Sequence, residues 1–259
     1  MDLGLKGRRA LVCASSQGLG YACAFALARE GAEIMVNGRD AAKLEATRAR
    51  IAGETGATVH AIVADLGAIE GRAHLVAQAG AVDILVNNNA GPPPGYFANW
   101  DEEAWLGAVQ ANMLPALMLI RSFLPGMQAQ KFGRIVNITS AMVKSPLAPM
   151  GLSTAARTAL TAACKALAPE VAADNVTINS LLPERFDTER QQNMARLAMA
   201  MKKITYEEAR EEIANSIAAK RFGRPEEFGD ACAYLCSAQA GFISGQQLQL
   251  DGGSYRGLV

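Results

Sequence analysis

The chain has few of the residues on which several common reaction types depend. Among its 259 residues, only His60 and His74 are histidines, 6% are aromatic, and five are cysteines. A Ser-His-Asp hydrolase needs a histidine base beside its serine, so this scarcity argues against that mechanism. The cysteines are odd in number and lie in strand or helix patterns, which is typical of buried thiols in a reducing cytoplasm. Cys232 and Cys236 lie one helical turn apart with no histidine near them, so we predict no metal site and a cytoplasmic protein.

The chain also has no excess of charge and no long apolar run. Lysines and arginines number 25, acidic residues number 25, and the formal net charge is zero. This balance gives no electrostatic attraction for nucleic acid or for an anionic membrane. No apolar run approaches the roughly 20 residues of a spanning helix, and the N-terminus, MDLGLKGRRA, lacks the apolar core of a signal peptide. We therefore expect neither nucleic acid nor a membrane as a partner.

The most informative segment that is present covers residues 8–29. An apolar run at 10–13 predicts a buried strand, and a small, flexible segment follows it at 14–20. A helix rich in alanine comes next. Gly18 and Gly20 allow the backbone to approach a ligand closely, and the free N–H groups of the first helical turn favour a phosphate. The alternative is an ordinary strand-to-helix turn, and the rest of the chain decides between the two.

Strands and helices alternate along the remaining sequence. Strands are expected at 33–37, 58–63, 83–87, 134–139, 176–181 and 247–250, and helices at 41–52, 67–79, 102–130, 154–173, 189–219 and from Pro225. Pro115 predicts a junction or kink within 102–130. This alternation predicts an α/β fold, a Rossmann-like doubly wound parallel sheet of about seven strands with helices on both faces. We find no repeat or linker, so 1–259 is predicted to be one domain.

Short motifs recur in a fixed order along nearly the whole chain. They are the glycine turn, Val63-Ala64-Asp65-Leu66, Leu85-Val86-Asn87-Asn88, Asn112, Ile138-Thr139-Ser140, Phe222-Gly223-Arg224-Pro225-Glu226-Glu227, Ser244-Gly245-Gln246 and Asp251-Gly252-Gly253. In this order they resemble the motifs of the short-chain dehydrogenase/reductase family, in particular those of 3-oxoacyl-[acyl-carrier-protein] reductases. The resemblance implies a Rossmann fold that binds NAD(P)H over the ends of the first four strands. It also implies an Asn, Ser, Tyr and Lys catalytic set and a homotetramer or homodimer.

The catalytic set is only partly present. Asn112 and Ser140 lie 28 residues apart, as the family pattern requires. The tyrosine and lysine expected at 153 and 157 are replaced by Ser153 and Arg157. A phenol, with a reference pKa of about 10, exchanges a proton far more readily than an aliphatic hydroxyl. Arg157 stays protonated and cannot relay protons, but it can still hold the nicotinamide ribose, so cofactor binding survives better than proton transfer.

The residue that follows the second strand indicates which dinucleotide is bound. An acid there would bind the adenosine ribose and repel a 2′-phosphate, but this chain has Asn37-Gly38-Arg39. Arg39 can bind that phosphate, so we predict NADP(H) over NAD(H), the alternative being a solvated arginine. Asp65 is implied to bind the adenine amine, or else it caps the next helix. The expected cofactor-binding residues are Ser15, Ser16, Gln17, Gly18, Leu19, Gly20, Arg39, Asp65, Leu66, Asn88, Asn89, Ala90, Arg157, Pro183, Glu184, Phe186 and Thr188.

Three further departures from the family pattern concern the cofactor site. The first glycine of the family turn is Ala14, and we expect it to fit with a negative φ and slight crowding. The Asn-Asn-Ala-Gly motif aligns with 87–90 by strand spacing or 88–91 by letter, and we follow the spacing. The family's Pro-Gly reads Pro183-Glu184 here, which puts an acid at the nicotinamide end.

Lys144 is a further candidate for proton transfer, because it lies in the loop expected to border the pocket. A desolvated lysine has a lowered pKa and can act as acid or base, although a solvated lysine or an anion contact is the commoner case. Ser140 is the best candidate to polarise a substrate, or it is an ordinary strand-end serine. The helical segment at about 184–219 resembles the family's substrate lid.

Three functions remain open. The first is an NADPH-dependent reductase of a small-molecule carbonyl or acyl thioester, which uses Ser140, Ser153 and either water or Lys144 in place of the phenol. The second is a non-redox enzyme on the same scaffold, such as a lyase or dehydratase, in which Glu184, Lys144 and Arg157 act. The third is a catalytically silent NADP-binding subunit. We favour the first because the dehydrogenase pattern is otherwise retained.

Overall fold

A single parallel sheet organises the computed structural model, which describes residues 1–258. Seven strands lie in the order β3-β2-β1-β4-β5-β6-β7, and every pairing between neighbours is parallel. The predicted Rossmann-like α/β fold in one domain is therefore confirmed. The strands are β1 (Arg9–Val12), β2 (Glu33–Gly38), β3 (Val59–Val63), β4 (Ile84–Asn87), β5 (Gly133–Ile138), β6 (Val176–Pro183) and β7 (Gln247–Leu250).

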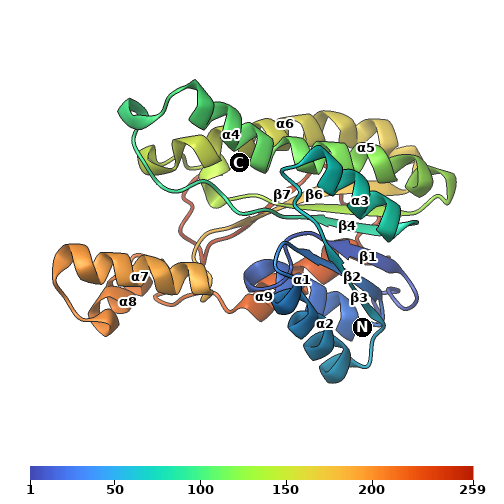
Figure 1. Cartoon of the computed structure of the whole chain (residues 1–259), viewed down its shortest axis with the longest axis horizontal. Helices are drawn as coiled ribbons and strands as arrows, with labels where there is room; N and C mark the ends of the chain where they lie inside the picture. The colour runs from blue at the N-terminus through green and yellow to red at the C-terminus, as the bar shows by residue number, and fades with distance from the viewer. Residues whose placement is uncertain (259) are drawn as a thin grey trace.

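Helices cover both faces of the sheet (Figure 1). One face carries α1 (Gly18–Arg29), α2 (Ala41–Thr55) and α9 (Pro225–Cys236). The other carries α3 (Ile69–Ala79), α4 (Glu102–Asn112), α5 (Leu114–Ala129) and α6 (Gly151–Val171). The segment predicted as a lid forms α7 (Glu189–Lys202) and α8 (Tyr206–Asn215), which project beyond the sheet, coloured orange in Figure 1.

The side chains of β1 show why both faces are covered. Ala10 and Val12 belong to the core beneath α1 and α9, whereas Leu11 and Cys13 belong to the core beneath α5 and α6. Successive side chains of a strand point to opposite faces, so an uninterrupted apolar run needs helices on both sides. All five cysteines are buried and free, and burial raises the pKa of the Cys13 thiol to about 12.

The strand order reverses at β1, and this reversal positions the site. Val12 at the end of β1 is paired with Val36 of β2 on one side and with Val86 of β4 on the other. The connections that leave β1 and β4 therefore diverge, which opens a crevice beyond the carboxyl ends of these strands. Such a switch point is where open α/β sheets bind their ligands.

The turn between β1 and α1 is tighter than expected. Ala14 has a φ of +44°, so the prediction of a negative φ at this position was wrong. The chain reverses sharply here, because Ala14 donates its N–H to the Asn37 side chain and Ser15 donates its own to the Asn37 carbonyl. A Cβ on Gly20 would come within 2.5 Å of the Ala14 carbonyl oxygen, so only glycine allows α1 to pack this closely.

The apolar segment at 102–130 forms two helices, and Pro115 lies in the first turn of the second, as predicted. Taken as one stretch, Glu102–Ala129 is long and apolar enough, by length and composition alone, to cross a membrane. The sequence analysis had not expected this. Core helices pass the same test. Here α5 buries Leu119, Ile120 and Phe123 in the core it shares with β5 and α6.

Candidate active site

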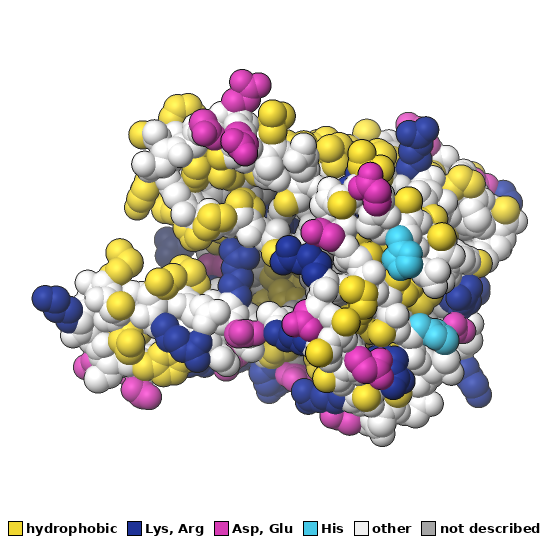
Figure 2. Space-filling model, in the orientation of Figure 1, with side chains coloured by type: hydrophobic (Ala, Val, Ile, Leu, Met, Phe, Trp, Pro, Cys, Tyr) yellow, Lys and Arg dark blue, Asp and Glu magenta, His cyan; other side chains and the backbone are white. Residues whose placement is uncertain are grey.

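A cleft of about 850 Å³ lies beyond the carboxyl ends of β1, β2, β4, β5 and β6. Its size is within the range of roughly 300–1,000 Å³ that is common for ligand pockets. Figure 2 shows it as a hollow between the projecting segment and the body of the molecule. Most of the predicted cofactor residues line it: Ser16, Gln17, Gly18, Leu19, Arg39, Asp65, Leu66, Asn88, Asn89, Ala90, Arg157, Pro183, Glu184, Phe186 and Thr188.

One end of the cleft is formed by the start of α1. Gln17 precedes the helix without a side-chain capping bond, and the first turn contains no acidic residue. Its N–H groups and the helix dipole therefore remain available to an anion. Arg39 lines the same end and has no hydrogen-bond or ion-pair partner among residues 1–258.

The acid that follows Arg39 is already engaged. The Asp40 carboxylate accepts a hydrogen bond of 3.0 Å from the Lys43 N–H and caps α2. This bond holds the Asp40 carboxylate at the start of α2, although its second oxygen still has the capacity to accept hydrogen bonds. The uncapped helix start and the glycines that admit the backbone fit the phosphates of a dinucleotide, and the unpaired Arg39 adds a positive charge at the same end of the cleft.

Two predicted cofactor residues, Ser15 and Gly20, lie behind this surface. Ser15 is fully buried, donates to the Val12 carbonyl at 2.7 Å and accepts from the Asn37 N–H at 3.1 Å. Asn88 donates to the Ala14 carbonyl at 3.2 Å, which joins the end of β4 to the turn. The hydrogen bonds of Ser15 and Asn88 shape the turn from behind.

Asp65 accepts the Gly67 N–H at 2.9 Å, while α3 begins after Ala68, which makes no side-chain capping bond. The Asp65 carboxylate therefore forms a local turn at the cleft edge rather than a helix cap. It remains a candidate for binding the adenine amine.

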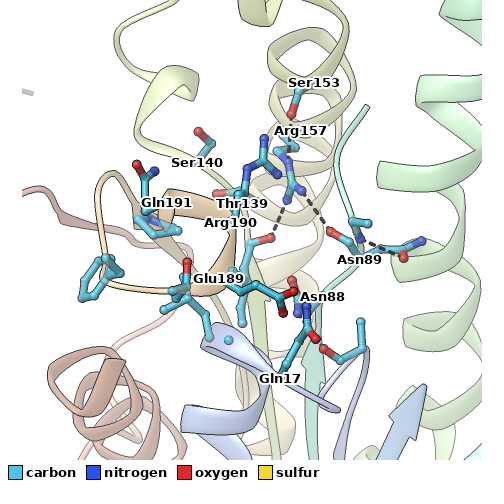
Figure 3. A pocket seen from close by; sticks show the side chains of 18 of the residues that line it. Gln17, Asn88, Asn89, Thr139, Ser140, Ser153, Arg157, Glu189, Arg190 and Gln191 are labelled. Atoms are coloured by element: carbon cyan, nitrogen blue, oxygen red, sulfur yellow. Dashed lines mark hydrogen bonds between the residues drawn. The ribbon is translucent and has the colours of Figure 1, made fainter. Parts of the chain in front are cut away.

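The other end of the cleft contains Ser140, Ser153 and Arg157 (Figure 3). Ser140 follows β5, accepts the Met142 N–H at 3.2 Å and directs its hydroxyl to the Met142 sulfur at 2.9 Å. Ser153 and Arg157 lie one turn apart on α6. The Arg157 Nε donates to the Ser153 Oγ at 3.2 Å, so the two replaced positions interact directly.

Arg157 is held by hydrogen bonds in a fixed orientation. It is only 8% exposed, and its two Nη atoms donate to the carbonyls of Ile138 at 2.7 Å and Asn89 at 3.2 Å. Burial, and secondly the positive charge of Arg190, lower the pKa of Arg157 to about 10. The guanidinium nevertheless stays protonated at neutral pH, as the sequence predicted.

Two of the predicted catalytic residues do not line the cleft. Asn112 ends α4, is 5% exposed and donates to the Ala90 carbonyl at 3.1 Å, so it supports the cleft wall from behind. Lys144 follows the short 3₁₀ turn η2 (Ala141–Val143), which carries it past the cleft, and its ammonium lies 5.5 Å from the centre of the Tyr255 ring.

Glu184 lies in the cleft at the position that was predicted to place an acid there. Burial raises the pKa of its carboxyl, nearby Arg185 lowers it, and Asp251 raises it further. Thr188 approaches the start of α1, since its Cγ2 lies 3.9 Å from where a Cβ of Gly18 would be. The Lys43 to Glu189 ion pair, at 3.7 Å, also joins α2 to α7, so the projecting segment borders the cleft mouth.

The sequence reasoning missed several residues that line the cleft. One group lies at the start of α7 and just before it: Arg185, Glu189, Arg190 and Gln191. Others lie on α2 and in loops: Lys43, Pro94, Leu147, Pro149 and Met150. Arg185 and Arg190, both among the first seven residues of the predicted lid, were a sequence signal for an anion-binding surface there. Among residues 1–258, no group of three or more His, Cys, Asp and Glu side chains is arranged to hold a metal ion.

Comparison with known proteins supports a common origin over nearly the whole chain. Residues 13–255 match the family model described as Enoyl-(Acyl carrier protein) reductase. The chain is similar to the Bos taurus dehydrogenase/reductase SDR family member 4, with 34% identity over 96% of this chain and 88% of that protein. It is also 31% identical to the NADPH-dependent reductase BacG of Bacillus subtilis (strain 168), over 97% and 99% of the two chains.

A solved structure shares the same fold closely. The crystal structure of a 3-oxoacyl (acyl-carrier-protein) reductase from Agrobacterium tumefaciens C58 with NADP bound superposes with a TM-score of 0.88. The two sequences are 30% identical, and the match covers 97% of this chain and 96% of the other.

Proposed function

The chain belongs to the short-chain dehydrogenase/reductase family, and from this premise we propose that it is an NADP(H)-dependent carbonyl reductase with a non-standard proton donor. One observation carries the proposal. A single cleft has an uncapped helix start and the unpaired Arg39 at one end, and Ser140, Ser153 and Arg157 at the other. Similar proteins described as NADPH-dependent or NADP-bound favour the phosphorylated cofactor.

NADPH, when bound, supplies a hydride to the carbonyl carbon, and the protein must stabilise the negative charge that develops on the carbonyl oxygen. The Ser153 oxygen accepts a hydrogen bond from Arg157 Nε, so its own O–H is polarised and can donate to the substrate. The guanidinium charge lies directly behind that hydroxyl. Preorganised donors of this kind stabilise a developing oxyanion without reorganising.

The final proton then comes from water rather than from a side chain at position 153. Lys144 is a weaker candidate for this step, because it does not line the cleft and its ammonium faces Tyr255. The non-redox alternative also invoked Lys144, so it loses one of its three candidate groups. As substrates we propose small carbonyl compounds, among which 3-oxoacyl thioesters are suggested by the similar 3-oxoacyl (acyl-carrier-protein) reductase.

The test is NADPH oxidation with a panel of 3-oxoacyl thioesters, simple ketones and oxo acids. The wild type is compared with the double variant Ser153→Tyr/Arg157→Lys, which restores the family pair at two positions that line or border the cleft. We expect turnover by the wild type. We also expect the double variant to be active, with the tyrosine phenol rather than water as the proton donor.

Turnover by the double variant alone would refute the proposal. In that case the cleft and cofactor site are sound, and the natural chain does not reduce carbonyls. NADPH binding without turnover by either protein would also count against a reductase and would favour the silent subunit.

A further inference from the structure

Two arginine side chains converge at the catalytic end of the cleft, next to Gly91. The position that a Cβ of Gly91 would take lies 3.6 Å from Arg157 Nη2, 3.5 Å from Arg190 Nη1 and 3.4 Å from Ser153 Oγ. Figure 3 shows the two guanidinium groups side by side beneath Ser153. Arg157 lies on α6 and Arg190 on α7, so the projecting segment places the Arg190 charge next to that of Arg157.

Neither positive charge is neutralised within residues 1–258. The three hydrogen bonds of Arg157 go to a hydroxyl and two backbone carbonyls, none of which is charged. Arg190 has no hydrogen-bond or ion-pair partner in the described part of the chain. Two adjacent like charges, one of them buried, are unfavourable unless an anion lies between them. The lowered pKa of Arg157, caused in part by Arg190, agrees with this repulsion.

The pair still has donors to offer. A guanidinium carries five N–H donors, and Arg157 uses one on Nε and one on each Nη atom. One N–H therefore remains on each Nη, on a side chain already fixed by its other bonds. Arg190 contributes a free fork, and forked donors match the two oxygens of a carboxylate.

We propose that Arg157 and Arg190 bind a carboxylate of the substrate, so that the enzyme acts on a small oxo acid. This inference rests on the proposed reductase function and narrows its substrate class. The Ser153 hydroxyl, which would polarise the carbonyl, lies 3.2 Å from the Arg157 guanidinium. The carboxylate must then be one or two carbons from the carbonyl, as in a 2-oxo or 3-oxo acid. A neutral thioester at this place would leave both charges uncompensated.

The same chemistry could also recognise a phosphate of the cofactor. The phosphate-binding features already described, at Gln17 and Arg39, lie at the opposite end of the cleft. In Figure 3, Gln17 and Ser153 are at opposite sides of the view, with Arg157 and Arg190 on the Ser153 side. The pair is therefore assigned to the substrate, and the experiment separates the two sources.

The experiment is calorimetric binding of pyruvate and acetoacetate, each paired with its methyl ester, to the NADP⁺ complex in chloride-free buffer. NADP⁺ carries no hydride, so binding is measured without turnover. We expect at least one acid to bind about tenfold or more tightly than its ester, because charged hydrogen bonds are worth roughly that factor. Arg190→Gln should remove this preference and leave NADP⁺ affinity unchanged. Arg196→Gln, an exposed change of the same charge on α7, should behave as the wild type.

Equal binding of acids and esters would overturn the proposal. A matching loss of NADP⁺ affinity in Arg190→Gln would also overturn it, because the pair would then serve a cofactor phosphate. The result is independent of catalysis. Failure to oxidise NADPH counts only against the reductase, and failure to prefer the acid counts only against the carboxylate site.

Discussion

Ala14→Gly should stabilise the protein, because Ala14 is held at a φ of +44°. A residue with a Cβ costs about 1–2 kcal/mol in the left-handed region, and glycine removes that cost. Against this, glycine gains freedom in the unfolded chain, which costs about 0.4–1 kcal/mol. The difference is a net stabilisation of about 0.8 kcal/mol, or roughly 2 °C in Tm for a protein of this size.

The assay is chemical and thermal denaturation at one fixed protein concentration. The control is Ala46→Gly, an exposed position within α2 where the backbone is helical. There glycine should destabilise by about 1 kcal/mol, the helix-propensity difference. The same substitution is thus expected to have opposite signs at the two sites. If Ala14→Gly destabilises as much as Ala46→Gly, the left-handed strain inferred for the turn is refuted.

Two further variants test the cofactor site and an ion pair near the projecting segment. Arg39→Gln should weaken NADPH binding by about ten- to hundredfold and leave NADH binding unchanged, and equal effects on both nucleotides would exclude a phosphate contact. Glu227→Gln should lower the free energy of unfolding at pH 7 by about 1 kcal/mol, a value reduced for surface screening. Hydrogen bonds from Arg221 and Arg224 lower the Glu227 pKa to about 2. Stability from this carboxylate is therefore complete above its unfolded pKa and lost as the pH falls to 2, where denaturation curves of variant and wild type should coincide.

Much of the fold could be predicted because local signals agreed with the tertiary structure. Apolar runs bounded by turn residues placed all seven strands to within a few residues, and β7 was predicted at 247–250, where it lies. The break between α7 and α8 was missed. Lys203 there is left-handed, and Thr205 with Glu208 forms a capping box, a Thr-x-x-Glu pattern that the sequence does contain.

The candidate site was less predictable where tertiary contacts decide the outcome. Strand spacing brought Asn88, Asn89 and Ala90 to the cleft, since the carboxyl ends of parallel strands share one edge. The position of Lys144 depends instead on η2, a turn without a clear sequence signal. The role proposed for Arg190 depends on its proximity to Arg157, which is 33 residues away in the sequence. A local sequence pattern cannot indicate that both arginines lack an acidic partner in the folded protein.

The two substitutions at positions 153 and 157 make physical sense as a pair. The Arg157 Nε donates to the Ser153 oxygen at 3.2 Å, so the two replacements interact directly with each other. A lysine ammonium is a point charge with three donors, and it could not hold two carbonyls and a hydroxyl while still presenting a fork to the cleft. The family's tyrosine and lysine, which transfer a proton, are therefore replaced by a serine and an arginine that hold a fixed, permanent positive charge. Such a pair binds a negatively charged substrate more favourably than a neutral one, which is the reason to assay oxo acids alongside thioesters.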